Sequence, residues 1–439
     1  MPFSAAVLRA LSCVLVSAAA VAVARVVGGN ARRTRVRGRR TVGSALPQVG
    51  GCVYLDYAAT CPIYPDVADA ILPFLYEHWG NPSSGHAYGA PSKIAIDLAR
   101  ERLRKLVNAD SASEVVFCSC GSEADNWAIS GALKPGRNHV VVSSIEHPAV
   151  LACVEALRKE GRCSFTVVGC DSSGIVDPAD VARAVRPGTT AVVSIMLANN
   201  EVGSVMDLRA ISDAVRAVDA NVLIHTDAAQ AVGKIDVDVE ALQVDLLTIV
   251  GHKFGAPKGV AALYARHGRA ELSPLFFGGG QEGGRRAGTE AVPSIVALGE
   301  AAQIWLEQGP TIAAHSTRLR DRLRAALEAR LDDTSVNGPL SDKTLPPDRA
   351  LPNVLSFAVR GIRASDVLFD LKDVVAASAS AACHAGSTSV SAVLRAVGVE
   401  EALAVGTLRL SVGRHTTEAE VDRAAKLICD RILAPKALV

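Results

Sequence analysis

A lysine at the end of an apolar run is the first residue whose position suggests chemistry. The run 247–250, in the stretch LTIVGHKFGAPKG (residues 247–259), predicts a buried strand that ends at Gly251 and is followed by His252 and Lys253. Two interpretations are open. A lysine can extend its charged end into water past apolar surface, as most lysines do. Alternatively, partial removal from water makes the amine neutral and nucleophilic.

Similar polar clusters follow other predicted strands. Between residues 65 and 300, helical patterns alternate with seven apolar runs, at 115–117, 140–142, 165–168, 191–196, 222–225, 246–250 and 260–264. This alternation predicts an α/β fold with a mostly parallel seven-stranded sheet and helices on both faces. Five runs lead into polar residues, at 119–128, 143–150, 197–204, 225–234 and 251–253. Because ligands bind at the carboxyl ends of such strands, one ligand would account for all five clusters.

These clusters hold what pyridoxal 5'-phosphate requires of a protein, which is an amine, a carboxylate for the pyridinium nitrogen and a cradle for the phosphate. Lys253 offers the amine and Asp227 the carboxylate. Gly121 and Ser122 precede the predicted helix 123–132, and a helix N-terminus binds phosphate readily. Taken singly, Asp227 and the Gly121-Ser122 pair are more simply explained as helix caps.

Motifs spread over residues 53–432 make the sequence similar to the class V aminotransferase family. They are, in order, YLDYAAT, WGNPSS, SEADN, EHPAV, NNEVG, HTDAAQAVGK, GHKFGAPKG, GGGQE, GTE, SAACHAGS and LRLSVGRHTTEAEVD. Within this group of fold-type-I pyridoxal phosphate proteins, the chain resembles cysteine desulfurases and selenocysteine lyases. The resemblance implies an enzyme that depends on pyridoxal 5'-phosphate and acts on an amino acid.

The resemblance implies a role for each residue that would contact the cofactor ring. Lys253 is implied to be the Schiff-base lysine, and Asp227 to pair with the pyridine nitrogen. His147 is implied to stack on the ring, where an imidazole could also shuttle protons near neutral pH. Gln230 is implied to contact the phenolic oxygen, and Asn200 to orient cofactor and substrate.

The phosphate and the substrate have implied partners as well. Phosphate contacts are implied for Gly121, Ser122 and His252, with Thr289 reaching in from the second subunit of a homodimer. Arg409, in LRLSVGR, is implied to hold the substrate carboxylate, a task that a planar guanidinium suits better than an ammonium.

Cys383, in the small polar stretch SASAACHAGSTSVS (residues 378–391), aligns with the family's nucleophile. It is implied to take sulfur or selenium from L-cysteine or L-selenocysteine as a persulfide or perselenide, leaving L-alanine. A chalcogen-acceptor protein would then receive the chalcogen.

Departures from the family pattern bear on the substrate. Val250 replaces a serine common in desulfurases, and together with GGGQE and the Cys383-His384 pair this favours a selenocysteine lyase. The length of the Cys383 loop is typical of cysteine desulfurases, which supply sulfur for iron–sulfur clusters or tRNA thiolation. An ordinary aminotransferase, which needs no loop thiol, is a third alternative. Cys120 replaces a glycine in the phosphate turn, and no role follows for it.

Composition and charge exclude other classes of protein. The net charge is +1 over 439 residues, and no basic stripe with interleaved aromatic residues occurs, which argues against a nucleic-acid partner. Ten cysteines in so long a chain do not form a small disulfide scaffold. The C-x-C of Cys118 and Cys120 lacks the second pair that a zinc site needs, so no metal is expected.

The N-terminal residues differ from the rest of the chain. No acidic residue precedes Asp56, and the apolar run 10–24 is followed by an arginine-rich tract over 32–40. This composition favours a mitochondrial presequence, with a membrane anchor that leaves the catalytic domain in the cytosol as the alternative and a secretory signal third. We therefore expect a targeting or anchor segment over 1–50, a large pyridoxal phosphate domain over 51–310 and a small α+β domain with the cysteine loop over 311–439.

Overall fold

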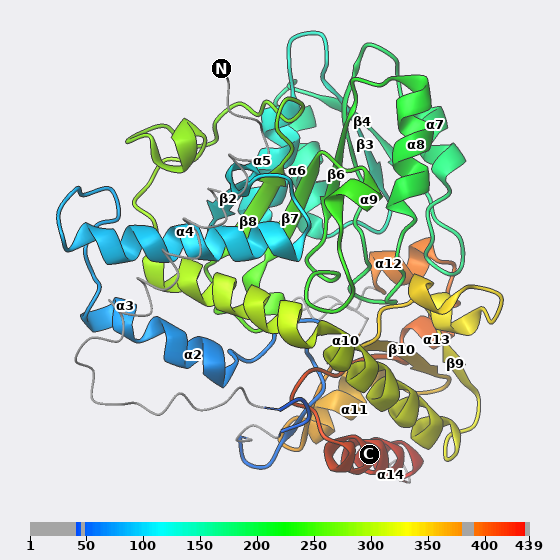
Figure 1. The fold of residues 1–439 in the computed structure, drawn as a ribbon. Helices are drawn as coiled ribbons and strands as arrows, with labels where there is room; N and C mark the ends of the chain where they lie inside the picture. The colour runs from blue at the N-terminus through cyan, green and yellow to red at the C-terminus, as the bar shows by residue number, and fades with distance from the viewer. Residues whose placement is uncertain (1–40, 45–48, 380–389, 435–439) are drawn as a thin grey trace. The chain divides into compact units, whose positions relative to one another are not determined.

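The computed structural model of the chain describes residues 41–44, 49–379 and 390–434. The fold below is that of the compact unit that begins at residue 41 (Figure 1). The predicted targeting segment up to residue 40 and the predicted nucleophile Cys383 lie outside the described residues. Among the helices that are described, none is both long and apolar enough to cross a membrane.

A seven-stranded sheet forms the larger part of this unit, in the order β2-β8-β7-β6-β5-β3-β4. Strands β3 to β7 pair in parallel, whereas β8 runs antiparallel to both of its neighbours. The strands are β2 (Val115–Cys118), β3 (His139–Ser143), β4 (Ser164–Val168), β5 (Thr190–Ser194), β6 (Leu223–Asp227), β7 (Leu246–Val250) and β8 (Ala261–Ala265). The predicted mostly parallel seven-stranded sheet is confirmed, and the predicted runs differ from these strands only at their ends.

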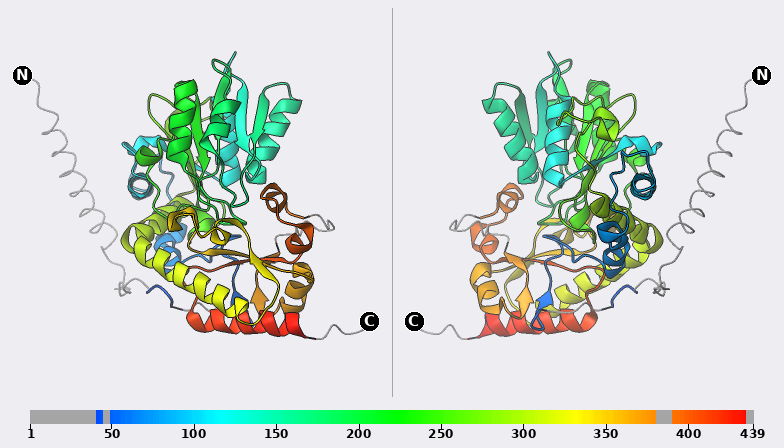
Figure 2. Two further views of the ribbon diagram at one scale, coloured as in Figure 1. Left: turned by 90° about the vertical axis from the view of Figure 1, so that its right-hand side faces the viewer. Right: turned by 90° about the vertical axis from the view of Figure 1, so that its left-hand side faces the viewer.

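Helices cover both faces of this sheet, as Figure 2 shows. In β3, Val140 and Val142 pack with α5 and α6, whereas Val141 belongs to the core on the opposite face, with α4, α7, α8 and α10. Because both faces are covered, most of the strands are apolar rather than alternating, whereas the edge strand β4 is partly exposed. The helices are α4 (Gly89–Leu106), α5 (Gly121–Ala132), α6 (Pro148–Lys159), α7 (Pro178–Ala184), α8 (Leu208–Val218) and α10 (Val292–Glu328).

The second part is built on a four-stranded antiparallel sheet, in the order β12-β13-β10-β9. Its core includes side chains of α11, α14 and the C-terminal half of α10, and also Val53 and Leu55 from the start of the described chain. Val53 and Tyr54 form β1 (Val53–Tyr54), which pairs in parallel with β11 (Val375–Ala376). The elements are β9 (Thr334–Val336), β10 (Val354–Val359), α11 (Ala364–Leu371), β12 (Ser378–Ala379), β13 (Thr407–Ser411) and α14 (Glu418–Leu433).

Helix α10 connects the two parts. It begins at Val292 and contains Pro310 in its interior, so the predicted domain boundary between residues 310 and 311 falls inside it. Proline usually ends a helix, but Trp305 and Ile312, on either side of it, are buried in one core and keep the helix continuous.

Short elements complete the described chain. They are α2 (Pro65–Ile71), α3 (Pro73–Tyr76), α9 (Val239–Leu242), α12 (Ala392–Ala396), α13 (Glu401–Ala404) and the 3₁₀ turns η1 (Ala112–Glu114), η2 (Gly251–Lys253), η3 (Gln281–Gly284), η4 (Gly338–Ser341) and η5 (Pro347–Arg349).

Candidate active site

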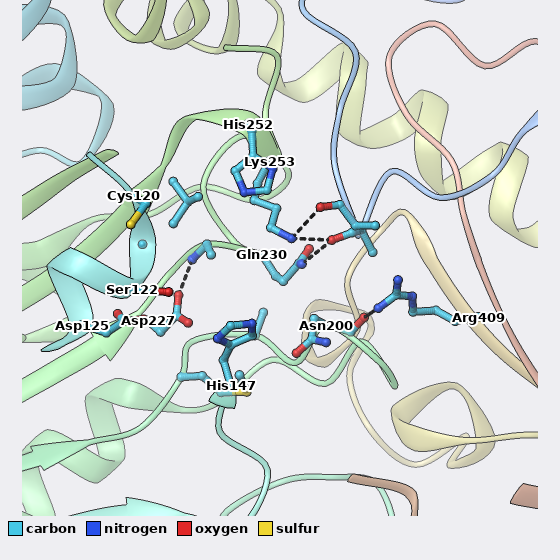
Figure 3. Close-up of a pocket in the computed structure, with 17 residues that line it drawn as sticks. Cys120, Ser122, Asp125, His147, Asn200, Asp227, Gln230, His252, Lys253 and Arg409 are labelled. Carbon is cyan, nitrogen blue, oxygen red and sulfur yellow. Dashed lines mark hydrogen bonds between the residues drawn. The ribbon is translucent and has the colours of Figure 1, made fainter. Parts of the chain in front are cut away.

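A cavity of about 330 Å³ lies beyond the carboxyl ends of β2, β3, β5, β6 and β7 (Figure 3). It is lined by nine of the predicted site residues, namely Gly121, Ser122, His147, Asn200, Asp227, Gln230, His252, Lys253 and Arg409. Thr289 is exposed and does not line this cavity, and Cys383 lies outside the described residues. Parallel strands therefore bring to one place side chains that are spread over most of the sequence.

Lys253 points into this cavity rather than into bulk water. The buried strand β7 ends at Val250, and the turn η2 then places Lys253 at the cavity wall. Its Nζ donates hydrogen bonds to the carbonyl oxygens of Ala58, at 2.8 Å, and Ala59, at 2.9 Å. Burial, followed by the positive charge of Arg409, lowers the pKa of the Lys253 amine. The geometry therefore favours the nucleophilic interpretation of this lysine over the solvent-directed one.

Asp227 lies at the end of β6 and is buried. Its Oδ1 accepts a hydrogen bond from the backbone N–H of Ala229, at 2.9 Å. Burial raises the pKa of the Asp227 carboxyl, although this bond and the nearby His147 and Lys253 act against the rise. A cationic N–H group in the cavity would lower the pKa again, because an opposite charge favours the ionised carboxylate.

His147 is the N-cap residue of α6. Its Nδ1 accepts a hydrogen bond from the backbone N–H of Ala149, at 3.1 Å, so the neutral ring carries its proton on Nε2. Solvent reaches the ring, yet the surrounding cavity walls remove part of its hydration and lower the pKa of His147. A neutral imidazole is therefore the form present near neutral pH.

The N-terminus of α5 forms one wall of the cavity. Its N-cap residue is Cys120, which is exposed and lines the cavity, and none of the described side chains caps the helix. A Cβ atom on Gly121 would lie 2.7 Å from Cγ2 of Val250, so only glycine allows this close approach of β7. The uncapped N–H groups of a 12-residue helix favour an anion at this wall.

Two further side chains lie close to Lys253. The Nε2 of Gln230 donates a hydrogen bond to the carbonyl oxygen of Ala58, at 2.9 Å, and its buried Oε1 has no partner among the described residues. The Nδ1 of His252 lies 3.1 Å from Oγ1 of Thr60. Burial, followed by the charge of Lys253, lowers the pKa of His252 to about 4, so this ring is neutral.

Arg409, in β13, lines the side of the cavity that faces away from Ser122 and Asp227 (Figure 3). Its Nη2 donates to Oδ1 of Asp56 and to Oγ of Ser378, each at 3.0 Å, and its Nη1 donates to the backbone oxygen of Asn200 at 3.2 Å. The buried Nε has no partner in the part of the chain that the structure describes. Figure 3 shows Arg409 and Asn200 on one side of the cavity, with Ser122 and Asp227 on the other.

Sequence reasoning did not identify three acids near this cavity. Asp125, in α5, is buried at the cavity wall, with Oδ1 3.7 Å from Nε2 of His225. Glu146 is buried and accepts a hydrogen bond from the N–H of Met196 at 2.9 Å, and burial raises its pKa to about 8. Asp56 binds Arg409. All three acids stand in motifs of the sequence, but nothing in those motifs indicates burial or contact with distant residues.

Known proteins with similar sequences belong to one family. The sequence profile of the class-V aminotransferase family matches residues 53–424. A protein of Nostoc sp. named cysteine desulfurase is 42% identical over 389 residues, which are 88% of this chain and 94% of that protein. The Clostridium botulinum protein named cysteine desulfurase IscS is 40% identical over 380 residues, covering 86% of this chain and 93% of its own length.

Solved structures agree with this assignment. The structure of a NifS-like protein superimposes with a TM-score of 0.78 at 33% identity, covering 87% of this chain and 99% of its own. The structure of SspA in complex with cysteine gives a TM-score of 0.70 at 32% identity, covering 83% of this chain and 99% of its own.

Proteins of this family use pyridoxal 5'-phosphate, and the residues in the cavity fit that group. An amine with a lowered pKa, a buried carboxylate, an uncapped helix N-terminus and the unpartnered Oε1 of Gln230 line the same space. They match the needs of an aldehyde, a pyridine nitrogen, a phosphate and a polar ring substituent. The chain therefore belongs to the class-V aminotransferase family, in the group that contains the cysteine desulfurases.

Proposed function

We propose that this protein removes sulfur from L-cysteine and leaves L-alanine, with Cys383 as the thiol that receives the sulfur. The observation that carries the proposal is a single cavity with Asp227 on one side, Arg409 on the other and Lys253 between them. An α-amino acid needs both sides, because its amine must reach the cofactor while its carboxylate is held. The names of the relatives, and the cysteine complex of SspA, favour cysteine as that amino acid.

We assign the residues that would hold pyridoxal 5'-phosphate from the family resemblance and from the side chains that line the cavity. The assignments are Lys253 for the aldehyde, Asp227 for the ring nitrogen, Gln230 for the phenolic oxygen and Gly121, Ser122 and His252 for the phosphate. When bound, the cofactor supplies an electron sink that acidifies the α-carbon of the substrate. Because Asp227 is buried, its charge acts on the ring nitrogen through a medium of low dielectric constant.

The chain's own residues perform the remaining work. Arg409 holds the substrate carboxylate, and Asn200 lies beside it. Lys253, whose pKa is lowered, removes the α-proton as a neutral amine. His147 carries a proton on Nε2 and exchanges it at the cavity. The sulfur of Cys383 then forms a bond to the substrate sulfur as the carbon–sulfur bond breaks, which leaves a persulfide on Cys383 and, after protonation, alanine.

The direct test is a purified-protein assay of sulfide and alanine release from L-cysteine, with L-selenocysteine alongside and with a thiol reductant present, because the outer sulfur of a persulfide leaves as sulfide only after reduction. We expect sulfide and alanine in equal amounts from cysteine. Release of a keto acid instead would identify an ordinary aminotransferase. Release of neither product, with the cofactor bound, would refute the proposed activity.

Selenocysteine remains a second candidate substrate because Val250, in place of serine, lines the phosphate end of the cavity. The variant Cys383→Ser separates the two substrates. A carbon–selenium bond is weaker than a carbon–sulfur bond, so we expect sulfide release to stop while measurable selenide release continues. Equal and complete loss of both would indicate one obligatory thiol step, and unchanged sulfide release would remove Cys383 from the mechanism.

We also propose that the active enzyme is a homodimer in which Thr289 serves the phosphate site of the partner subunit. Thr289 is exposed and does not line the cavity of its own chain. Large apolar side chains are also exposed, as a partner surface requires. They include Leu75, Tyr76, Trp79, Tyr88 and Phe277.

Mixing two inactive variants tests this arrangement. Lys253→Ala has no catalytic amine, and Thr289→Ala is expected to bind cofactor weakly. In a mixed dimer, one site would combine Lys253 of the second variant with Thr289 of the first, so refolding the two together should restore activity. No restoration, with dimers shown by light scattering, would contradict a role for Thr289 in the partner site.

Two finer proposals concern the cellular context. We propose that a chalcogen-acceptor protein receives the sulfur of Cys383, which transfer of labelled sulfur to candidate proteins would test.

We also propose that residues 1–50 act as a mitochondrial targeting segment, with a membrane anchor as the alternative outcome. Fusing these residues to a fluorescent protein and locating it in cells distinguishes the two.

A further inference from the structure

A carboxylate of the protein itself binds Arg409. Oδ1 of Asp56 lies 3.0 Å from Nη2 of Arg409 and also accepts a hydrogen bond from Oγ of Ser378 at 3.0 Å. The same hydroxyl accepts from Nη2 of Arg409 at 3.0 Å, so the three side chains form a closed triangle. The arginine proposed to hold the substrate carboxylate is thus already paired with an acid.

The fold fixes these three side chains independently of any ligand. Ser378 lies directly opposite Arg409 in the pairing of β12 with β13. Asp56 forms a backbone bridge with Ser411, the last residue of β13. The side chains of Arg409 and Asp56 are only 13% and 19% exposed, so water screens their attraction weakly.

Other charged groups near Arg409 do not replace Asp56. The charge of Arg409 also acts on Glu201, and burial raises the pKa of the Glu201 carboxyl. This carboxyl accepts a hydrogen bond from Oγ of Ser391, at 2.6 Å. Lys253 is the nearby cation, and its pKa is lowered by Arg409 and raised by Asp56. Asp56 is therefore the acid that directly contacts the guanidinium.

We propose that Asp56 sets the affinity of the site for α-amino carboxylates, because its carboxylate competes with that of the ligand for Arg409. This inference rests on the proposed role of Arg409 and adds a specificity residue to it. Asp56 acts through Arg409, so it is a positioning residue rather than a catalytic one. It weakens the binding of cysteine and of the product alanine together, which shortens the time that alanine occupies the site.

Competition for Arg409 determines the sign of the effect of a substitution. Asp56→Asn keeps an oxygen that can accept from Arg409 but removes the competing charge. We expect the KM for L-cysteine and the dissociation constant for L-alanine to fall together by about tenfold, since close, partly buried charges couple by this much or more. Both ligands present the same α-carboxylate to Arg409. The KM for cysteine and the dissociation constant for alanine should therefore fall by the same factor. If Asp56 only oriented Arg409, both constants would rise instead.

The experiment measures L-alanine binding to the holoenzyme from the absorbance change of the bound cofactor, together with kcat and KM for L-cysteine. Asp56→Ala removes both the charge and the hydrogen-bond acceptor. Ser378→Ala removes the bridging hydroxyl while keeping both charges, so this variant measures the effect of orientation alone. Cysteamine, which has no carboxylate, is the ligand control, and its affinity should not increase in Asp56→Asn. Thermal unfolding of each variant shows whether it is folded.

Each outcome separates this inference from the proposed function. Unchanged or weaker alanine binding in folded Asp56→Asn overturns the inference. Equal tightening for cysteamine overturns it as well, because the effect would not involve the carboxylate. If Arg409→Ala leaves alanine binding unchanged, Arg409 is not the carboxylate site, and the inference falls with that assignment. If alanine binds as expected while cysteine yields no sulfide, the proposed activity fails and the inference stands.

Discussion

The cofactor end and the substrate end of the cavity are built in different ways. At the cofactor end, Asp227 and Lys253 follow neighbouring parallel strands of one sheet, and the Gly121 turn follows another strand of it. At the substrate end, Arg409 comes from a different sheet and meets Asp56, Ser378 and the backbone of Asn200, which lie far apart in the sequence. The cofactor end is built mainly on the large sheet, whereas the substrate end joins the small sheet to the backbone of Asn200 in the large part of the fold.

The two ends also treat charge differently. At the cofactor end, burial changes protonation, lowering the pKa of Lys253 and His252 and raising that of Asp227. At the substrate end, the charge of Arg409 is paired with the acid Asp56. Groups with shifted pKa values suit proton transfer, whereas paired charges suit recognition. The difference separates the chemistry of this site from its selectivity.

The largest effect should come from removing the amine at the cofactor end. Lys253→Ala is expected to abolish turnover of cysteine and the visible absorbance of the lysine-bound cofactor, because no other lysine among the described residues lines this cavity. Absorbance spectra and sulfide assays on the purified variant test this. Retained turnover would mean that the cofactor is attached elsewhere.

A smaller effect should follow at the substrate end. In Arg409→Lys a point charge replaces a planar fork, so the KM for cysteine should rise by the equivalent of about 1–3 kcal/mol while kcat changes less. The cofactor spectrum should not change, since Arg409 is assigned to the substrate. An unchanged KM would remove Arg409 from the carboxylate site and, with it, the distinction between the two ends.

A third effect should appear in how stability depends on pH rather than in turnover. The pKa of Glu146 is about 8 in the folded protein, against about 4.3 in an unfolded chain. The folded state therefore binds the extra proton between these values, and its free energy of unfolding should decrease as pH rises from about 4.3 to 8. Glu146→Gln should flatten that decrease. Urea unfolding of both proteins at several pH values measures it, and identical slopes would show that Glu146 is not buried as a neutral acid.

Much of the large sheet could be predicted because its strands are buried on both faces. Continuous apolar runs indicated all seven strands, and the polar residues that follow five of these runs placed Asp227 and Lys253 together. The predicted domain boundary between residues 310 and 311 lies inside α10, because the packing of Trp305 and Ile312 keeps the helix continuous past Pro310. The local sequence pattern does not show in which hydrophobic core a residue will be buried.

The substrate end could be predicted only in part. Arg409 followed from resemblance, but its pairing with Asp56 depends on a backbone bridge between residues 56 and 411 that no local pattern encodes. The burial of Glu146 and Asp125 is likewise a property of the assembled fold. The role of Thr289 stays a prediction, because it concerns a second chain. That of Cys383 stays one too, because it lies outside the described residues.

The pairing of β1 with β11 has a consequence for synthesis of the protein. Val53 and Tyr54 leave the ribosome long before their partners Val375 and Ala376 are made. Until then β1 lacks the strand with which it pairs, and such long-range pairing is slow to form. Asp56, which follows β1, can bind Arg409 only after translation has passed residue 409. A nascent chain can therefore build the large sheet before it can hold a substrate.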